Sequence, residues 1–243
     1  MIKVGVLGAR GRMGSEVVRA VTEAADLELV AALDLGDSLD SLVANGAQVV
    51  VDFTTPNSVM ANLEFPISHI SRGYWNYWFD DARIAKIKSL LSTSKSGVLI
   101  APNFAIGAVL MMEFATKAAK YFESAEIIEL HHPNKVDAPS GTAARTAELM
   151  SKSRKEAGLA AMPDATSTSL DGARGATVGD IPVHSVRLRG LVAHQEVLLG
   201  GIGETLSIRH DSIDRVGFMP GVLLGVRQVV THPGLTFGLE NFM

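Results

Sequence analysis

The chain contains no cysteine, few aromatic residues and no marked excess of either charge. Without cysteine it cannot form disulfides, thiolate nucleophiles or cysteine-based zinc sites. A net charge of −4 gives no attraction to nucleic acid or to an anionic membrane surface. No apolar run is long enough to span a bilayer, and the first residues lack the long apolar region of a signal peptide. We therefore expect a cytoplasmic protein that binds neither nucleic acid nor membranes.

The amino-terminal residues carry the pattern of a dinucleotide-binding turn. Hydrophobic residues make up 47% of the 243 positions, enough for one large or two modest domains. An apolar run over residues 4–8 is typical of a parallel strand buried on both faces. Glycines follow at Gly8, Gly11 and Gly14, and apolar residues then recur at helical spacing. Glycines between a strand and a helix allow the backbone to approach a pyrophosphate.

An acid follows at the position where such folds bind the adenine ribose. A second strand over 27–33 ends at Asp34, about twenty residues beyond the last glycine. A carboxylate there favours NADH, because it repels a 2′-phosphate. Arg10 and Arg12 could instead bind that phosphate, so use of both cofactors stays open. With further strands expected over 47–53 and 98–101, the pattern predicts a doubly wound parallel α/β sheet of Rossmann type.

The most informative stretch is Glu129 to Ala143, which reads Glu-Leu-His-His-Pro-Asn-Lys-Val-Asp-Ala-Pro-Ser-Gly-Thr-Ala. A strand that ends in His131 and His132 directs the two imidazoles to opposite faces. Residues 140–142 predict a helix start, whose N–H groups with Lys135 would bind a carboxylate or phosphate. A histidine and a lysine beside that site can transfer protons at neutral pH. The structural alternative is a strand–loop–helix connection whose polar residues cap the helix.

The carboxy-terminal half predicts a second, α+β domain. Its elements are expected as a helix over 142–155, a long loop over 159–180 and strands over 183–188, 194–199 and 204–210. We interpret these strands as an antiparallel block in an open mixed or antiparallel sheet that must cover its apolar face. Basic side chains on or beside them are read as surface or interface residues: His184, Arg187, Arg189, His194 and His210. An apolar helix over 220–230 and a strand over 235–239 predict a return to the first domain.

Together these residues resemble the dihydrodipicolinate reductase family over nearly the whole chain. The resemblance rests on residues 8–14, 52–56, 101–104 and 129–143. It implies reduction of 4-hydroxy-tetrahydrodipicolinate, a cyclic unsaturated dicarboxylic acid, to tetrahydrodipicolinate by NADH or NADPH in diaminopimelate and lysine biosynthesis. It also implies a homotetramer built on the open sheets. A dehydrogenase of the same fold that acts on another amino or imino acid is the alternative enzyme.

The family motifs assign roles to residues of this chain. By resemblance, His131 is the catalytic acid/base and Lys135 the proton donor. The substrate carboxylates would contact His132, Lys135, Gly141 and Thr142. The cofactor would contact Gly8, Ala9, Arg10, Gly11, Arg12, Met13, Asp34, Ala101, Pro102, Asn103 and Phe104. No metal site is expected. The expected domains are a dinucleotide-binding domain (1–104 and 214–243) and a substrate-binding and oligomerisation domain (105–213), with the nicotinamide in the cleft between them.

One family motif, Gly-Thr-Thr-Gly-Phe after the fourth strand, is missing. Residues 72–79 instead read Arg-Gly-Tyr-Trp-Asn-Tyr-Trp-Phe, and residues 66–71 lack the expected apolar strand. Read from the second base, the codons of residues 74–78 give two glycines at the family spacing, with threonines allowed. We therefore interpret residues 66–78 as a shifted reading frame. The printed residues would replace a buried strand, crowd the nicotinamide and leave weak cofactor binding. The alternative is an inactive or NADH-sensing remnant with an aromatic lid or stacking patch.

Overall fold

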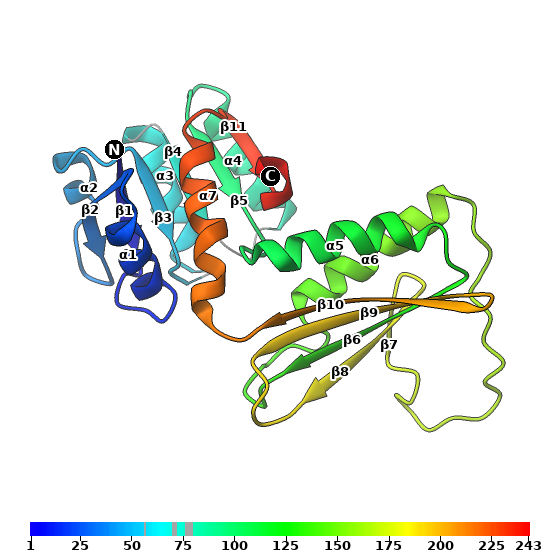
Figure 1. The fold of residues 1–243 in the computed structure, drawn as a ribbon. Helices are drawn as coiled ribbons and strands as arrows, with labels where there is room; N and C mark the ends of the chain where they lie inside the picture. Colours follow the sequence, from blue (N-terminus) through cyan, green and yellow to red (C-terminus); the bar gives the residue numbers. More distant parts are fainter. Residues whose placement is uncertain (56, 70–71, 76–79) are drawn as a thin grey trace. The chain divides into compact units, whose positions relative to one another are not determined.

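The computed structural model describes residues 1–55, 57–69, 72–75 and 80–243. The chain folds into two compact units (Figure 1). Unit 1 comprises Met1–Ile106 and Arg215–Met243, and unit 2 comprises Gly107–Asp214. Each unit has its own sheet.

The centre of unit 1 is a sheet of six parallel strands in the order β11-β5-β4-β3-β1-β2. The strands are β1 (Ile2–Leu7), β2 (Leu27–Leu33), β3 (Val49–Asp52), β4 (Arg72–Trp75), β5 (Gly97–Ile100) and β11 (Gly234–Phe237). All of β3 and β5 and most of β1 are buried. This burial on both faces explains the continuous apolar runs, and the doubly wound sheet expected from the sequence is confirmed.

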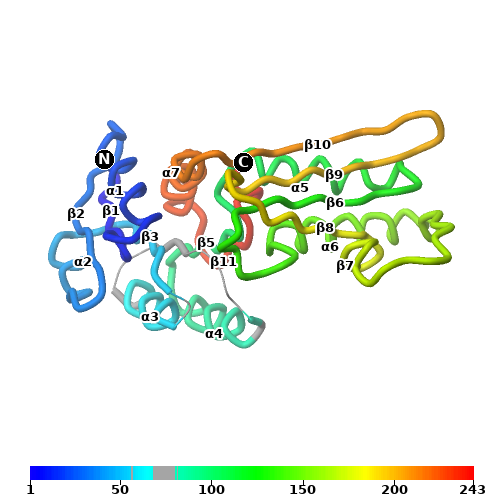
Figure 2. The backbone as a smooth tube through the Cα atoms, turned by 90° about the horizontal axis from the view of Figure 1, so that it is seen from below, coloured from blue at the N-terminus to red at the C-terminus, as the bar shows by residue number. Residues whose placement is uncertain are grey.

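Helices cover both faces of this sheet. On one face lie α1 (Gly14–Glu23) and α7 (Met219–Val229), and on the other lie α3 (Val59–His69) and α4 (Asp81–Leu91) (Figure 2). The shorter elements are α2 (Asp40–Ala44) and two 3-10 turns, η1 (Arg215–Phe218) and η2 (Leu239–Phe242). None of the helices in the described ranges is long and apolar enough to cross a membrane. The chain begins in unit 1 and returns to it at the end, where α7 packs on the sheet and β11 adds an edge strand. Unit 1 therefore contains both ends of the chain.

The fourth strand differs from the sequence-based expectation. Pro66 lies within α3, and β4 pairs in parallel with β3 and β5. The expectation that the printed residues would remove the fourth strand is therefore wrong, because the strand is present at Arg72–Trp75, whereas residues 66–69, which lack a strand pattern, are helical. Between β3 and β5 a backbone has ladder partners on both sides, and any non-proline residue can use them. Residues 70–71 and 76–79, on which the frame interpretation also bears, lie outside the described residues.

Unit 2 is a five-stranded sheet in the order β10-β9-β6-β8-β7, with α5 (Ile106–Ala119) and α6 (Gly141–Glu156) on one face (Figure 1). The strands are β6 (Ser124–His131), β7 (Ala176–Val178), β8 (Ile181–Arg187), β9 (Ala193–Gly201) and β10 (Glu204–Ser212). Along β6 every second side chain, from Ala125 to His131, is buried. This alternation is that of a strand with one face toward a core, here formed with the two helices.

The strands over 181–212 do not form one antiparallel block. β6 lies between β8 and β9, pairing in parallel with β8 and antiparallel with β9. The sheet is therefore mixed, one of the two forms predicted for it, whereas the prediction that the later strands form one antiparallel block is wrong. Local sequence does not show that an earlier strand inserts between two later ones, because strand order depends on contacts distant in the chain.

Candidate active site

The glycine-rich turn between β1 and α1 is closed tightly on itself. Gly8 has φ of 74°, in the left-handed region that favours glycine. A Cβ on Gly14 would lie 1.9 Å from the carbonyl oxygen of Gly8. A Cβ on Gly11 would lie 3.1 Å from the same oxygen. The three glycines therefore allow the backbone of the turn to fold against the start of α1, as a dinucleotide-binding turn requires.

Asp34 follows β2 and turns its carboxylate toward this loop. Oδ1 accepts the backbone N–H of Leu35 at 2.9 Å, and Oδ2 accepts that of Arg10 at 2.8 Å. These two backbone hydrogen bonds, the one from Leu35 first, lower the pKa of Asp34 below its usual value. The carboxylate is therefore charged at neutral pH and can accept hydrogen bonds from ribose hydroxyls.

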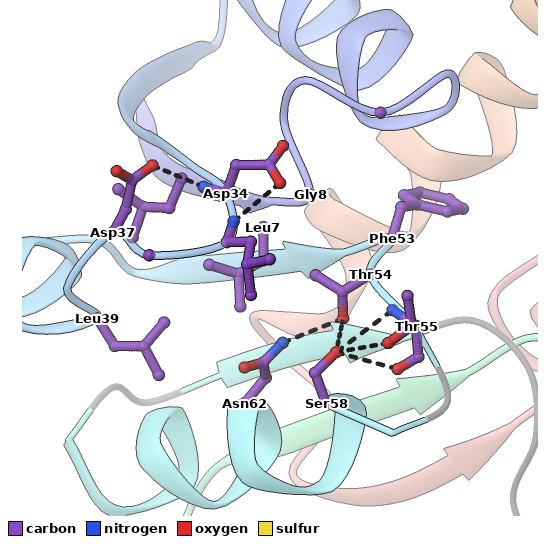
Figure 3. Close-up of a pocket in the computed structure, with 14 residues that line it drawn as sticks. Leu7, Gly8, Asp34, Asp37, Leu39, Phe53, Thr54, Thr55, Ser58 and Asn62 are labelled. Carbon is purple, nitrogen blue, oxygen red and sulfur yellow. Dashed lines mark hydrogen bonds between the residues drawn. The ribbon is translucent and has the colours of Figure 1, made fainter.

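Asp34 lines a cavity of about 520 Å³ beside the glycine turn (Figure 3). In Figure 3, Asp34 and Asp37 lie on one side, and Thr54, Ser58 and Asn62 form a hydrogen-bonded group on another. The lining comprises Leu7, Gly8, Gly11, Leu33, Asp34, Leu35, Gly36, Asp37, Leu39, Phe53, Thr54, Thr55, Ser58 and Asn62. This volume lies within the ~300–1,000 Å³ of ligand sites, and apolar walls with few polar groups suit a nucleoside.

The structure assembles some of the predicted cofactor residues around the cavity. Gly8, Gly11 and Asp34 line it. Ala101–Phe104 follow β5 and are not among its lining residues, although the Phe104 ring packs edge-on against Phe53 at 5.9 Å. Sequence reasoning missed Asp37, Ser58 and Asn62. The position of Asp37, three residues after Asp34, could have indicated that it lies near the predicted ribose site. No sequence pattern indicates that Asn62, an asparagine within α3, lines the cavity.

A second group of functional side chains gathers in unit 2 where β6 ends. His131 is 9% exposed and faces the helices, whereas His132 is exposed, as the alternation of a strand predicts. The Nδ1 atom of His131 lies 2.5 Å from a carboxylate oxygen of Glu129. Glu129 is completely buried, and Arg187 on β8 donates to both of its oxygens at 2.8 Å. The interpretation of Arg187 as a surface or interface residue is wrong, because it pairs with this buried acid.

The electrostatics of Glu129 follow from these partners. Burial alone would raise the pKa of this carboxyl, but the hydrogen bonds from His131 and then Arg187 lower it to about 2. Glu129 is therefore an anion at neutral pH and acts only as a hydrogen-bond acceptor.

The loop between β6 and α6 brings Lys135 to the start of the helix. The Lys135 ammonium contacts the carboxylate of Asp137. Burial opposes ionisation of Asp137, but the hydrogen bond from Lys135 and weaker backbone ones, including that of Gly141, lower its pKa. Ser140 caps α6 by accepting the N–H of Ala143 at 3.2 Å. Lys135 and the backbone N–H of Gly141 thus contact a carboxylate of the chain itself, and binding of a ligand carboxylate at this place stays a prediction.

Comparison with known proteins gives a consistent result over the whole chain. The family model described as dihydrodipicolinate reductase, N-terminus, matches residues 2–104, and that of the C-terminus matches residues 107–243. The chain is 64% identical to the 4-hydroxy-tetrahydrodipicolinate reductase of Streptomyces griseus and 62% identical to that of Streptomyces avermitilis. Both alignments cover 100% of this chain and 98% of the relative.

A solved structure agrees with these sequence matches. The dipicolinate-bound dihydrodipicolinate reductase of Paenisporosarcina sp. TG-14 is 40% identical, with a TM-score of 0.88 and complete coverage of both chains. Solved dehydrogenases at 10–13% identity, including a probable dehydrogenase from Thermotoga maritima, share the fold alone. The chain therefore belongs to the dihydrodipicolinate reductase family.

Proposed function

We propose that the chain reduces 4-hydroxy-tetrahydrodipicolinate to tetrahydrodipicolinate with NADH or NADPH, a step of lysine and diaminopimelate biosynthesis. The observation that carries this proposal is the group at the end of β6. A buried histidine, His131, ends this strand. Lys135 and the start of α6 come next in the chain, and together they would form a carboxylate site. The relative from Paenisporosarcina was solved with dipicolinate, a cyclic dicarboxylate of matching chemistry.

The substrate carboxylates would bind where Asp137 now lies. Lys135 and the backbone N–H groups of Gly141 and Thr142 supply positive charge and hydrogen-bond donors at the start of α6. His132 follows at the exposed end of β6 and can donate a further hydrogen bond. Because Asp137 engages Lys135 in the free chain, a bound substrate carboxylate has to displace it.

The reaction needs one proton for each hydride. Replacing the 4-hydroxyl group by hydrogen consumes a hydride, and the departing hydroxyl takes up a proton to leave as water. The reduced nicotinamide supplies the hydride when it is bound. An imidazole and an ammonium group can both take part in proton transfer, and the site contains both. We assign His131 as the catalytic acid/base and Lys135 as a proton donor that also binds substrate.

The cofactor would bind in unit 1. The glycine turn from Gly8 through Met13 fits the pyrophosphate, and Asp34 fits the adenine ribose at the cavity of Figure 3. Ala101–Phe104, which follow β5, would lie nearer the nicotinamide. Unit 1 is thus proposed as the dinucleotide-binding domain and unit 2 as the substrate-binding and oligomerisation domain. The reaction requires that the two sites meet in the ternary complex.

We further propose a homotetramer and a cytoplasmic location. The face of the unit 2 sheet opposite α5 and α6 carries half-buried apolar side chains such as Ile128 and Leu130. Joining such faces between subunits would cover them. Light scattering coupled to size exclusion tests the assembly, and a monomer at micromolar concentration would contradict it. The cytoplasm is where reduced nicotinamide cofactors are regenerated.

Steady-state reduction of 4-hydroxy-tetrahydrodipicolinate, followed by loss of NADH absorbance, tests the activity. Lys135→Ala should lower kcat/KM by about 100-fold or more while NADH binding is kept. Lys120→Ala, at an exposed lysine on the loop after α5, is the matched control and should act like the unchanged chain. Equal rates in both variants would contradict the assignment of Lys135.

The second candidate function is an inactive or NADH-sensing remnant of the same family. It is favoured by one observation, the replacement of Gly-Thr-Thr-Gly-Phe by residues 74–79 of the printed sequence. Resequencing the gene from the codon of Glu64 to that of Arg83 separates the two. A restored glycine motif supports the working reductase. Confirmed tyrosines and tryptophans, together with weak NADH binding and no turnover, would support the remnant.

A further inference from the structure

Glu129 is a fully buried anion that the proposed proton transfer does not use directly. It connects three elements of unit 2. On its own strand it accepts from His131, and from β8 it accepts both guanidinium hydrogen bonds of Arg187. At the start of α6 it accepts the backbone N–H of Ser140 at 3.2 Å. A buried charge with this many partners is costly to place and needs a physical explanation.

We propose that Glu129, held by Arg187, is the positioning residue that prepares His131 for proton transfer, an inference that rests on the proposed reductase function. The His131 ring has two nitrogens, and only one can face Glu129. Nδ1 faces it, so Nε2 is the nitrogen directed away from the strand and available to a reactant.

The ionised carboxylate also decides the tautomer of His131. An anionic carboxylate has no hydrogen to donate, so the short contact at 2.5 Å requires that Nδ1 carries the hydrogen. The neutral ring then has an acceptor at Nε2, and the protonated ring has a donor there. The protonated ring is the form that donates a proton, and Nε2 is then the nitrogen that can donate it to a reactant.

Arg187 extends this arrangement to the substrate-binding loop. Its guanidinium donates to the carbonyl oxygen of Asp137 at 2.7 Å as well as to Glu129. The loop that carries Lys135 is therefore tied to the same ion pair as His131. The carboxylate of Glu129 thus aligns the proton-transfer histidine with the helix start that binds the substrate carboxylate.

The charged groups near His131 come from its own strand, from β8 and from the loop before α6. Glu129 lies on its own strand, and Arg187 lies directly opposite on β8. The loop before α6 contributes the ion pair of Lys135 and Asp137. On the other side, β9 places the uncharged Ala193 opposite His131. Glu129 is therefore the negative charge in contact with the ring, and a substitution of Glu129 removes that charge.

The test replaces Glu129 by glutamine, which has the same shape. Glu129→Gln can keep an oxygen toward Ser140 and one nitrogen of Arg187 while it presents an NH₂ group to His131. We expect kcat to fall by about 100-fold. Binding of dipicolinate, measured by calorimetry, should stay within roughly threefold, because Lys135 and the start of α6 are unchanged.

A matched control lies on the same strand. Glu126 also contacts an arginine and a histidine, Arg174 at 2.5 Å and His184 at 2.7 Å, but on the opposite face of the sheet. Glu126→Gln should leave kcat within roughly threefold. A His131→Asn background adds a second control. If Glu129 acts through His131, Glu129→Gln should cost almost nothing further there.

The outcomes separate positioning from a purely structural role. A loss of dipicolinate affinity as large as the loss of kcat would indicate a purely structural role and would overturn the proposal. Long-range ¹H–¹⁵N NMR of the unchanged chain provides a readout that needs no variant and no turnover. A neutral His131 with its hydrogen on Nδ1 supports the proposal, and one with its hydrogen on Nε2 overturns it. Absence of reductase turnover in the unchanged chain would instead count against the proposed function, while the tautomer still decides this inference.

Discussion

Asp37 accepts a hydrogen bond from the guanidinium of Arg10, with 3.2 Å between Oδ2 and Nη2. The same oxygen accepts the backbone N–H of Asp34 at 2.8 Å. The Nε atom of Arg10 lies 3.8 Å from the carboxylate of Asp34, so the arginine is held between two acids. These acids line the proposed adenosine cavity and oppose a 2′-phosphate, whereas Arg10 is the group that would bind one.

Removal of Asp37 should therefore move the cofactor preference toward NADPH. In Asp37→Ala the site loses one negative charge and Arg10 is free to turn toward a 2′-phosphate. We expect the affinity for 2′,5′-ADP, measured by calorimetry, to rise about tenfold relative to that for 5′-AMP, or ~1.4 kcal/mol. Both ligands lack the nicotinamide, so the measurement does not require a working nicotinamide site. Asp40→Ala changes the net charge equally, and an equal rise there would refute a specific role for Asp37.

Gly14 should not tolerate a side chain. Its Cβ would lie 1.9 Å from the Gly8 carbonyl oxygen and 3.0 Å from the Ala9 Cα, both backbone atoms that cannot turn aside. Gly14→Ala should therefore displace the glycine turn, lower stability by about 1–3 kcal/mol and weaken binding of 5′-AMP. Urea unfolding and calorimetry measure the two effects. Gly217→Ala adds the same methyl group where no atom lies within 4 Å, and it should change neither quantity much.

Much of unit 1 could be predicted from the sequence because its signals are local. An apolar run, a glycine turn and an acid after the next strand lie close together in the chain, and the structure joins Gly8 and Asp34 at one cavity. The fourth strand could not be predicted from its residues. Its backbone pairs with β3 and β5 whatever its side chains are. The neighbouring strands therefore determine that this segment is a strand, although its own residues do not favour one.

Unit 2 shows what local patterns omit. The segment around His131 is recognisable from the sequence, but Arg187, the partly buried partner of Glu129, lies 58 positions away from Glu129. Nothing in the residues around Arg187 distinguishes it from an exposed strand arginine. Only the parallel pairing of β6 with β8 brings it to the site, and strand order is not written in either strand alone. The sequence shows Glu129 at the start of the informative segment, but the sequence alone does not predict that its carboxylate is buried.

The free energy of unfolding should decrease at acidic pH because Glu129 becomes protonated. Its pKa is about 2 in the folded chain and near 4.5 when unfolded, so the unfolded state takes up the proton first as the pH falls. The contribution is complete above pH 4.5 and is lost between about pH 4.5 and 2, and it amounts to about 3 kcal/mol. Urea unfolding at pH 6 and pH 3 should show a larger decrease for the unchanged chain than for Glu129→Gln. Equal decreases would mean that other carboxyls account for the acid sensitivity.

Asp137 should compete with the substrate. Its carboxylate contacts the Lys135 ammonium, and the backbone hydrogen bond from Gly141 helps to lower its pKa, so it is charged at neutral pH. A dicarboxylate that uses the same donors has to displace this internal anion and overcome its repulsion. Asp137→Asn should therefore strengthen dipicolinate binding about fivefold to tenfold, as a removed like charge in a partly exposed site implies.

Calorimetric titration of dipicolinate at several salt concentrations measures this effect. The gain should shrink as ionic strength rises, because the repulsion between Asp137 and the ligand is screened. Asp164→Asn, which breaks an exposed ion pair with Arg174 in the same unit, removes an equal charge and should leave the affinity nearly unchanged. Weaker binding in Asp137→Asn would mean the opposite relationship. Asp137 would then hold Lys135 in its binding position, and the substrate would bind beside the ion pair rather than in place of the aspartate.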